Sequence, residues 1–488
     1  MKMKLKMILV VFLAIIITSC TENFESINTN PNVPNDVPPN LLLPGVIYGP
    51  LNTLVYESWE IGNIVIQHTA KNQFVNEDRY LWGERNSIWN SFYANLRNVQ
   101  NMLLKSETEQ KKNYQAIALI IRSWMYSVLT DCYGDIPYSQ AIKAKTDGIN
   151  FPVYDKQEDI YKGMLDDLKL ASDLLGTSTE KVSGDILYKG DLTKWKKLAN
   201  SLRIRMLMRI SDRKSVAADL QAIVNNSNYP IMESNDDNGA LTYLSAFPNQ
   251  FPLHTTRVGS FNEYRISKTI TDTLKSLNDP RLPIFARPTP ATENTANPVI
   301  MGIPNGMDDV KALTYNGGQQ NQSPVGRLFF EDAITAKGLK VAKGVIMNYA
   351  ELQFLLAEAA NKGLISGDAK TYYENGIKAS FQYYELEMPT GYLALPQVAY
   401  KGGTEGLEQI GFQKWISLFF QGLEAWFDWR RTNIPRLIPG ESNLNGNKIP
   451  VRFIYPTIEQ TLNSENLSKA IARQGADNIN TRVWWDVQ

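Results

Sequence analysis

Apolar residues recur at helical spacing along most of the chain. Ile117, Ile121, Trp124 and Val128 are four, three and four residues apart, which places them on one face of a helix. Similar stripes recur elsewhere, so the chain is predicted to be mainly α-helical. We expect helix pairs over about 86–131, 155–210, 346–384 and 405–430. Repeated pairs suggest a scaffold of the tetratricopeptide type, although the roughly 34-residue consensus of that repeat is not found in any of them.

The pattern changes between residues 225 and 345. Periodicity fades there, and Gly, Pro, Asn and Thr become frequent, as in 248–252 and 316–321. Loops of this length inside a compact protein are usually functional or disordered, and the aromatic residues among them argue against plain disorder. We therefore predict an irregular, loop-rich lobe with a few short strands, packed against the helical scaffold.

The N-terminus has the pattern of a secretory signal. Three lysines precede the apolar stretch Met7–Ile17, which is too short to span a bilayer of roughly 30 Å as a helix. Thr18 and Ser19 then lead directly to Cys20, an order that resembles the lipobox of bacterial lipoproteins. Residues 1–19 are thus expected to be removed, Cys20 to be lipidated, and residues 20–45, which contain several prolines, to form an extended tether ahead of a single body over 46–488.

Composition excludes several classes of function. Lys plus Arg and Asp plus Glu number 50 each, a balance that argues against nucleic acid and against polyanionic ligands as main partners, although a local charged patch can be hidden in a total of zero. The chain has only two His and two Cys, so His-based metal chemistry and a disulfide framework are not expected. No phosphate-binding loop, zinc motif or nucleophile elbow is present, and we predict no catalytic residues, no cofactor and no metal site.

Two charged helical segments are assigned structural roles. The basic residues between Lys194 and Arg209 are interpreted as a solvated helix face. Asp428 and Arg431 are three residues apart on a helix, so their side chains are expected to pair.

Several segments together resemble a known family. The chain is similar to the SusD/RagB family of Bacteroidetes outer-membrane lipoproteins, in particular its SusD-like subgroup. The similarity rests on these segments, which span nearly the whole chain in the family's order: Asn28-Thr29-Asn30-Pro31-Asn32, Leu129–Tyr138, Trp195–Arg209, Asp279–Pro283, Tyr349–Ala359, Gln413–Arg431, Pro450–Pro456 and Arg482–Asp486.

The resemblance implies a specific architecture and role. Four tetratricopeptide-like helix pairs would form a right-handed superhelical scaffold against the irregular lobe. The protein would be lipid-anchored in the outer membrane, facing outward over a TonB-dependent, SusC-like transporter. It would bind oligosaccharides, or peptides as in the RagB branch, without catalysis.

Candidate ligand-binding residues come from two stretches that mix aromatic rings with amides or arginine. Aromatic rings can stack on sugar faces while amides and guanidinium groups bind hydroxyls. The resemblance implies ligand contacts in the loop before the first helix pair and in the irregular lobe. The candidates are therefore Asn72, Arg79, Tyr80 and Trp82 in the first stretch, and Phe247, Phe251, Tyr264, Tyr315 and Asn316 in the second.

Two other roles remain open from the sequence. Carboxylate pairs for glycoside hydrolysis meet only in the folded protein, so a helical glycoside hydrolase is an alternative. A scaffold that stabilises a transporter without touching ligand is another.

Overall fold

The computed structural model describes residues 37–255 and 262–487. The predicted signal peptide, the lipidated Cys20 and the first part of the predicted tether lie outside the described residues. The body that begins at Pro39 is one compact unit.

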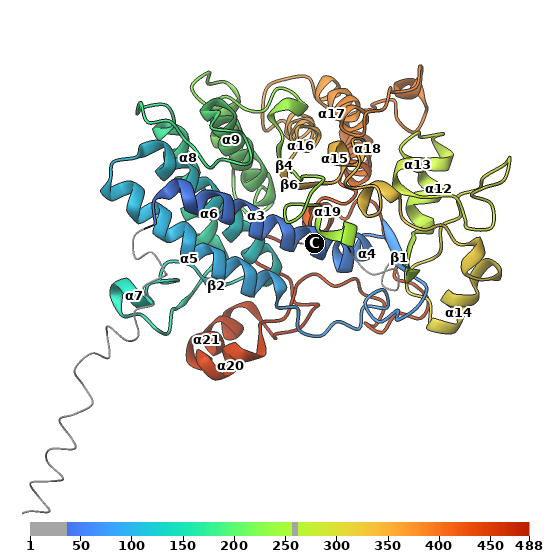
Figure 1. Ribbon diagram of the computed structural model, residues 1–488, viewed down its shortest axis with the longest axis horizontal. Coiled ribbons are helices and arrows are strands. Elements are labelled where there is room, and N and C mark those ends of the chain that lie inside the picture. The colour runs from blue at the N-terminus through green and yellow to red at the C-terminus, as the bar shows by residue number, and fades with distance from the viewer. Residues whose placement is uncertain (1–36, 256–261, 488) are drawn as a thin grey trace, which may run out of the picture. The chain divides into compact units, whose positions relative to one another are not determined.

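Most of this body is helical, as predicted, and the main helices pack side by side in chain order (Figure 1). Their bounds are α3 (Pro39–Glu57), α5 (Ser87–Thr108), α6 (Lys112–Tyr133), α8 (Gln157–Leu174), α9 (Leu192–Arg209), α16 (Tyr349–Asn361), α17 (Ala369–Tyr383), α18 (Gly403–Ser417) and α19 (Glu424–Thr432). Shorter helices are α4 (Asn63–Val65), α7 (Ala144–Asp147), α10 (Ala217–Val224), α20 (Thr457–Leu462) and α21 (Ser464–Gln474).

The helices form successive neighbours rather than one bundle. Helix α3 packs on α5, α5 on α6, α6 on α8 and α8 on α9, and α9 then contacts α16, which packs on α17 and α18. Each of the four helical segments predicted from the sequence therefore contains two helices. In the last segment the break falls between α18 and α19, where Phe420 and Gly422 adopt positive φ angles of 62° and 63°.

The prediction of an extended tether up to residue 45 was wrong, because α3 begins at Pro39. A proline in the first turn costs no hydrogen bond, since that N–H has no helical partner. Pro44 and Pro50 lie inside the helix. The stripe Leu43, Val46, Ile47 and Leu51 is fully buried against the neighbouring elements, and this burial offsets the bonds lost at the prolines.

The irregular lobe is built from short elements, also as predicted. It contains α12 (Lys268–Ser276), α13 (Leu282–Phe285), α14 (Asp309–Thr314) and α15 (Gly338–Val341). The strands form three antiparallel pairs: β1 (Thr69–Lys71) with β5 (Tyr264–Ile266), β2 (Ile136–Pro137) with β3 (Tyr154–Asp155), and β4 (Gly239–Thr242) with β6 (Lys343–Met347). The pairing of Thr69 with Ile266 joins the lobe to the loop that follows α4.

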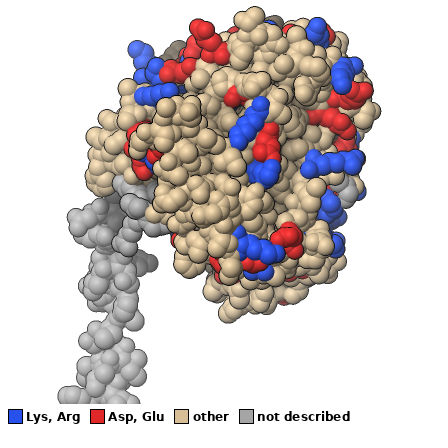
Figure 2. Space-filling view, turned by 90° about the vertical axis from the view of Figure 1, so that its right-hand side faces the viewer, with Lys and Arg blue, Asp and Glu red and all other residues tan. Residues whose placement is uncertain are grey.

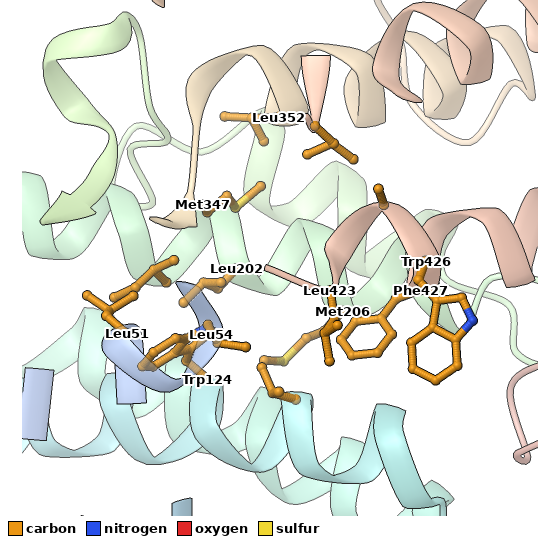
Figure 3. Close-up of a cluster of buried hydrophobic side chains, with 14 of the residues drawn as sticks. Leu51, Leu54, Trp124, Leu202, Met206, Met347, Leu352, Leu423, Trp426 and Phe427 are labelled. Carbon is orange, nitrogen blue, oxygen red and sulfur yellow. The ribbon is translucent and has the colours of Figure 1, made fainter. Parts of the chain in front are cut away.

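The core lies where α3, α6, α9, α16 and α19 meet (Figure 3). Side chains from segments far apart in the sequence point toward one another there, including Leu54, Trp124, Met206, Leu352 and Phe427, and all are buried. Burial of one such side chain contributes roughly 1.5–3 kcal/mol, so this junction is a main source of stability.

Buried ion pairs also join the helices. Arg205 on α9 binds Glu351 on α16 through two hydrogen bonds of 2.6 and 2.5 Å. The expected pair of Asp428 and Arg431 is present at 2.9 Å. The interpretation of 194–209 as a solvated face was wrong for its three arginines, Arg203, Arg205 and Arg209, which are buried.

No helix in the described part of the chain is both long and apolar enough to cross a membrane.

Candidate functional site

A groove of about 750 Å³ lies on the irregular lobe, lined in part by residues of α12 and α14. We call it the lobe groove. Its volume falls in the range of roughly 300–1,000 Å³ that is usual for small-molecule sites. Its lining includes Gln67, Lys268, Thr269, Asp272, Asn305, Met307, Lys311, Tyr315, Arg436, Ile438, Gly440 and Glu441.

Two amide side chains form the inner part of the groove. Asn305 Nδ2 donates to the Thr69 carbonyl at 2.8 Å and to Asp78 Oδ1 at 2.6 Å, and its Oδ1 accepts from Ser267 Oγ at 2.6 Å. Gln67 Nε2 donates to the Ile438 carbonyl at 2.7 Å, and its Oε1 accepts from Thr269 Oγ1 at 2.8 Å. Both amides are therefore fixed by the protein before any ligand binds.

Asp78 supports this inner wall from behind. Its carboxyl is completely buried and accepts hydrogen bonds from Asn305 Nδ2 and, at 3.1 Å, from the Lys71 N–H. Burial raises the pKa of Asp78 to about 7, although the hydrogen bonds from Asn305 and Lys71 act in the opposite direction. Asp78 thus orients Asn305 without lining the groove itself.

The two segments 304–307 and 438–441 meet backbone to backbone. A Cβ atom on Gly440 would lie 2.0 Å from the Asn305 carbonyl oxygen, and one on Gly306 would lie 2.8 Å from Gly440 Cα. The Ser442 N–H donates to the Gly306 carbonyl at 3.0 Å. Only glycine fits at these two positions, and their contact holds the two segments together.

Tyr315 is the predicted site residue that lines the lobe groove. It follows α14, is half-buried and packs on the small apolar cluster of Ala70, Val75, Ile303, Met307 and Ala312. Asn316 is exposed beside it, with its amide donating to the Asn321 carbonyl at 3.0 Å. Arg79 lies behind the groove, where its Nε donates to the Ser442 carbonyl at 2.7 Å.

Four other predicted site residues lie in the interior. Asn72, Tyr80, Phe251 and Tyr264 are buried, Asn72 donating to Gln322 Oε1 at 2.7 Å and Tyr264 packing on Trp59 at 4.3 Å. Phe251 packs edge-on against Tyr243 with ring centroids 5.4 Å apart. No face of these rings is open for a sugar to stack on, so they are not included in the proposed site.

Trp82 and Phe247 lie in two further places. Trp82 is half-buried, packs on Trp426 and Phe453 with centroids 5.9 and 5.8 Å apart, and donates from Nε1 to the Glu77 carbonyl at 2.9 Å. Phe247 is 87% exposed. It sits in the loop that borders a second groove of about 730 Å³ at the start of α3, whose lining combines aliphatic residues such as Ile186 and Leu244 with Tyr48 and Tyr243. The predicted residues are therefore not gathered in one site.

Residues 436–441 contribute to the groove but were not predicted. Arg436 and Ile438, the latter 78% exposed, come from an irregular stretch more than 100 positions after Tyr315 in the chain. The available signal was a bulky aliphatic residue and an arginine between two prolines in an otherwise polar loop.

No group of three or more His, Cys, Asp or Glu side chains in residues 37–255 and 262–487 is arranged to hold a metal ion. The two carboxylates of the groove, Asp272 and Glu441, are each held in an ion pair with a lysine.

The fold defines a class of protein: a row of helix hairpins that carries a loop-rich lobe with a groove. The sequence profile of the SusD-like proteins, described as starch-binding and associating with the outer membrane, matches residues 31–456. The chain belongs to this SusD-like family, as the sequence segments indicated.

Solved structures agree with this assignment. A SusD homologue from Bacteroides fragilis NCTC 9343 is 30% identical, with a TM-score of 0.78 over 93% of this chain and 100% of the other. A chitin-binding protein is 29% identical, with a TM-score of 0.78 over 92% and 99%. A chitin-binding SusD homologue from Flavobacterium johnsoniae is 25% identical, with a TM-score of 0.77 over 91% and 99%. A search of curated proteins finds no significant match.

Proposed function

We propose that this protein binds oligosaccharides in the lobe groove and delivers them to a TonB-dependent, SusC-like transporter of the outer membrane. The family description and the chitin-binding relatives support a carbohydrate ligand. The observation that carries the proposal is the groove itself, in which Tyr315 and the apolar Met307 and Ile438 face the same space as several hydrogen-bonding side chains.

This combination suits a sugar ring physically. A pyranose has a flat face of C–H groups and a rim of hydroxyls. Tyr315 offers an aromatic surface for the flat face, and its own packing on Met307 and Ala312 keeps the ring in place. Thr269, the lysines and the arginine around it offer groups for the hydroxyls. The second groove has fewer polar side chains in its lining, and the hydroxyls of its Tyr48 and Tyr243 already donate to the Pro248 carbonyl and to Asn52 Oδ1.

The first test compares Tyr315→Ala with Tyr372→Ala in titration calorimetry against a glycan panel. Tyr372 is also half-buried, lies on α17 and does not line the groove, so it controls for loss of a tyrosine. We expect Tyr315→Ala to weaken binding by about 1–2 kcal/mol, or roughly fivefold to thirtyfold, and Tyr372→Ala to leave affinity unchanged. Equal affinities for both variants and the parent would contradict the proposed site.

The same panel separates the alternatives. Peptides bound in place of glycans would assign the protein to the peptide-binding branch. New reducing ends in the glycan mixture would show hydrolysis by a pair of carboxyl groups directed at the scissile bond, and would contradict the proposed binding role.

Delivery to a transporter requires a cell-surface location and a physical partner. We propose that acylation of Cys20 tethers the protein to the outer membrane, where several acyl chains would hold it stably. Mass spectrometry of the membrane-extracted protein should find a diacylated or triacylated cysteine at the mature N-terminus, and affinity purification under mild detergent should recover a large outer-membrane barrel. An unmodified N-terminus, or purification without a barrel, would contradict this part of the proposal.

A further inference from the structure

The lobe groove contains more positively charged than negatively charged side chains. Lys268 is in an ion pair with Asp272 one helical turn further along α12, and Lys311 Nζ lies 2.6 Å from Glu441 Oε1. The groove has a fifth charged residue, Arg436. Within residues 37–255 and 262–487, the Arg436 side chain makes no ion pair and no hydrogen bond. The groove therefore carries one positive charge in excess, in a chain whose total charge is zero.

The main chain around Arg436 is fixed even though its side chain is not engaged. The Pro435 carbonyl accepts a hydrogen bond from Trp429 Nε1 at 3.1 Å, and the Ile438 carbonyl accepts one from Gln67 Nε2 at 2.7 Å. These two bonds hold the backbone on either side of Arg436. The backbone of Arg436 is consequently held at a defined position at the edge of the groove.

The inner amides of the groove are engaged by the protein, whereas the side-chain donors of Arg436 are not. Both N–H groups and the oxygen of the Asn305 amide are already engaged, and Gln67 uses its nitrogen and its oxygen on the protein. Arg436, by contrast, offers a planar fork of N–H donors and no acceptor. Such a fork matches the paired oxygens of a carboxylate or sulfate better than it matches a single hydroxyl.

The two lysines can join it at small cost. Side-chain exposures are 48% and 54% for Lys268 and Asp272, and 54% and 68% for Lys311 and Glu441. Ion pairs this exposed contribute little to stability, so either lysine can turn toward an anion in the groove. On this side of the molecule, Lys or Arg and Asp or Glu side chains lie next to one another rather than in a large patch of one sign (Figure 2). Attraction of an anion would thus be local to the groove.

We propose that the lobe groove selects anionic oligosaccharides, with Arg436 binding a carboxylate or sulfate of the glycan while Tyr315 packs on a neighbouring sugar ring. This inference rests on the proposed function, since it names the class of sugar taken by the same site.

The test is a binding series on the full mature protein with matched probes. Oligogalacturonate and its fully methyl-esterified form have the same sugars and length and differ in charge, and a sulfated oligosaccharide array distinguishes sulfate from carboxylate. The variants are Arg436→Gln, which removes the charge, and Arg436→Lys, which keeps the charge without the fork. Arg97→Gln on α5 is the control, because Arg97 is exposed and outside the groove.

We expect uronate or sulfated glycans to bind and their neutral counterparts to bind at least tenfold more weakly. Arg436→Gln should lose about tenfold in affinity for the anionic glycan, which corresponds to about 1.4 kcal/mol, and Arg436→Lys should lose less. Arg97→Gln should match the parent protein, and added salt should weaken binding of the anionic glycan only.

Other results would overturn the inference in distinguishable ways. Tighter binding of neutral glycans would reject the anionic class while leaving oligosaccharide binding intact. The same conclusion would follow if Arg436→Gln and Arg97→Gln bound an anionic glycan with equal affinity. Absence of binding to every glycan class would reject the proposed function and this inference together.

Discussion

Acid should destabilise the protein through one residue next to the lobe groove. His68 follows Gln67, which lines the groove, and is fully buried with its ring between Trp415 and Phe419 at centroid distances of 4.8 and 5.3 Å. Burial lowers the pKa of His68 from 6.5 to about 3, because the charged imidazolium would lose its hydration there. In the folded protein His68 is therefore neutral between pH 6.5 and about 3, a range in which an unfolded chain would protonate it.

The sign and size of the effect follow from this difference. Between pH 6.5 and about 3 the unfolded chain binds a proton at His68 and the folded chain does not, so the free energy of unfolding falls as the pH falls. Each pH unit contributes about 1.4 kcal/mol. At about pH 4.5 the loss from this residue alone should reach roughly 3 kcal/mol.

Urea unfolding followed by tryptophan fluorescence can isolate this contribution. The wild type is compared with His68→Phe, which places an uncharged ring between the same two neighbours, at about pH 7.5 and 4.5. Any cost of fitting the larger ring is present at both pH values and cancels. The stability difference between the two proteins should shift by roughly 3 kcal/mol in favour of His68→Phe on acidification.

The outcome also bears on the site. Because Gln67 holds the Ile438 carbonyl across the groove, glycan binding by the wild type should fall with stability at low pH, whereas His68→Phe should retain it. Unfolding curves of wild type and His68→Phe that shift in parallel between the two pH values would refute the reasoning.

Two further substitutions test the placement of residues around the groove. Trp82→Ala should lower the free energy of unfolding by about 2–4 kcal/mol, because the ring packs on Trp426 and Phe453. Glycan affinity measured by calorimetry should change less than twofold. A large loss of affinity in a protein that remains folded would place Trp82 in the site. Gly440→Ala should lower the free energy of unfolding by about 1–3 kcal/mol and weaken glycan binding, because the added Cβ would meet the Asn305 carbonyl oxygen at 2.0 Å. The control is Gly83→Ala, whose Cβ would have no neighbour within 4 Å. Equal stability and affinity of the two variants would show that the glycine contact does not hold the two segments.

Helical periodicity predicted the scaffold because it depends only on local spacing. The stripe of Ile117, Ile121, Trp124 and Val128 lies on α6, and all four side chains are buried. Local rules failed where packing overrode them. Helix α3 was missed because its prolines suggest extended chain, while its buried apolar stripe could be recognised only against a partner helix.

The arginines of α9 show a second limit. Arg205 and its partner Glu351 are 146 residues apart, so the sequence gives no indication that the charge is paired and buried. The same applies to the site. Tyr315 could be identified as an aromatic residue in an irregular stretch, but residues 436–441 reach the groove only through the fold. Tyr264 was a candidate because it lies in an irregular stretch with other aromatic residues, but its ring packs on Trp59 and is buried.

The contact between Gly306 and Gly440 has a kinetic consequence. The separation of segments 304–307 and 438–441 is set there by main-chain atoms, and so does not depend on an opening motion of the two segments. A ligand meets a backbone already in place, and only exposed side chains around it need to reorient during association. Differences in affinity among glycans should then come mostly from their dissociation rate constants, while their association rate constants are similar.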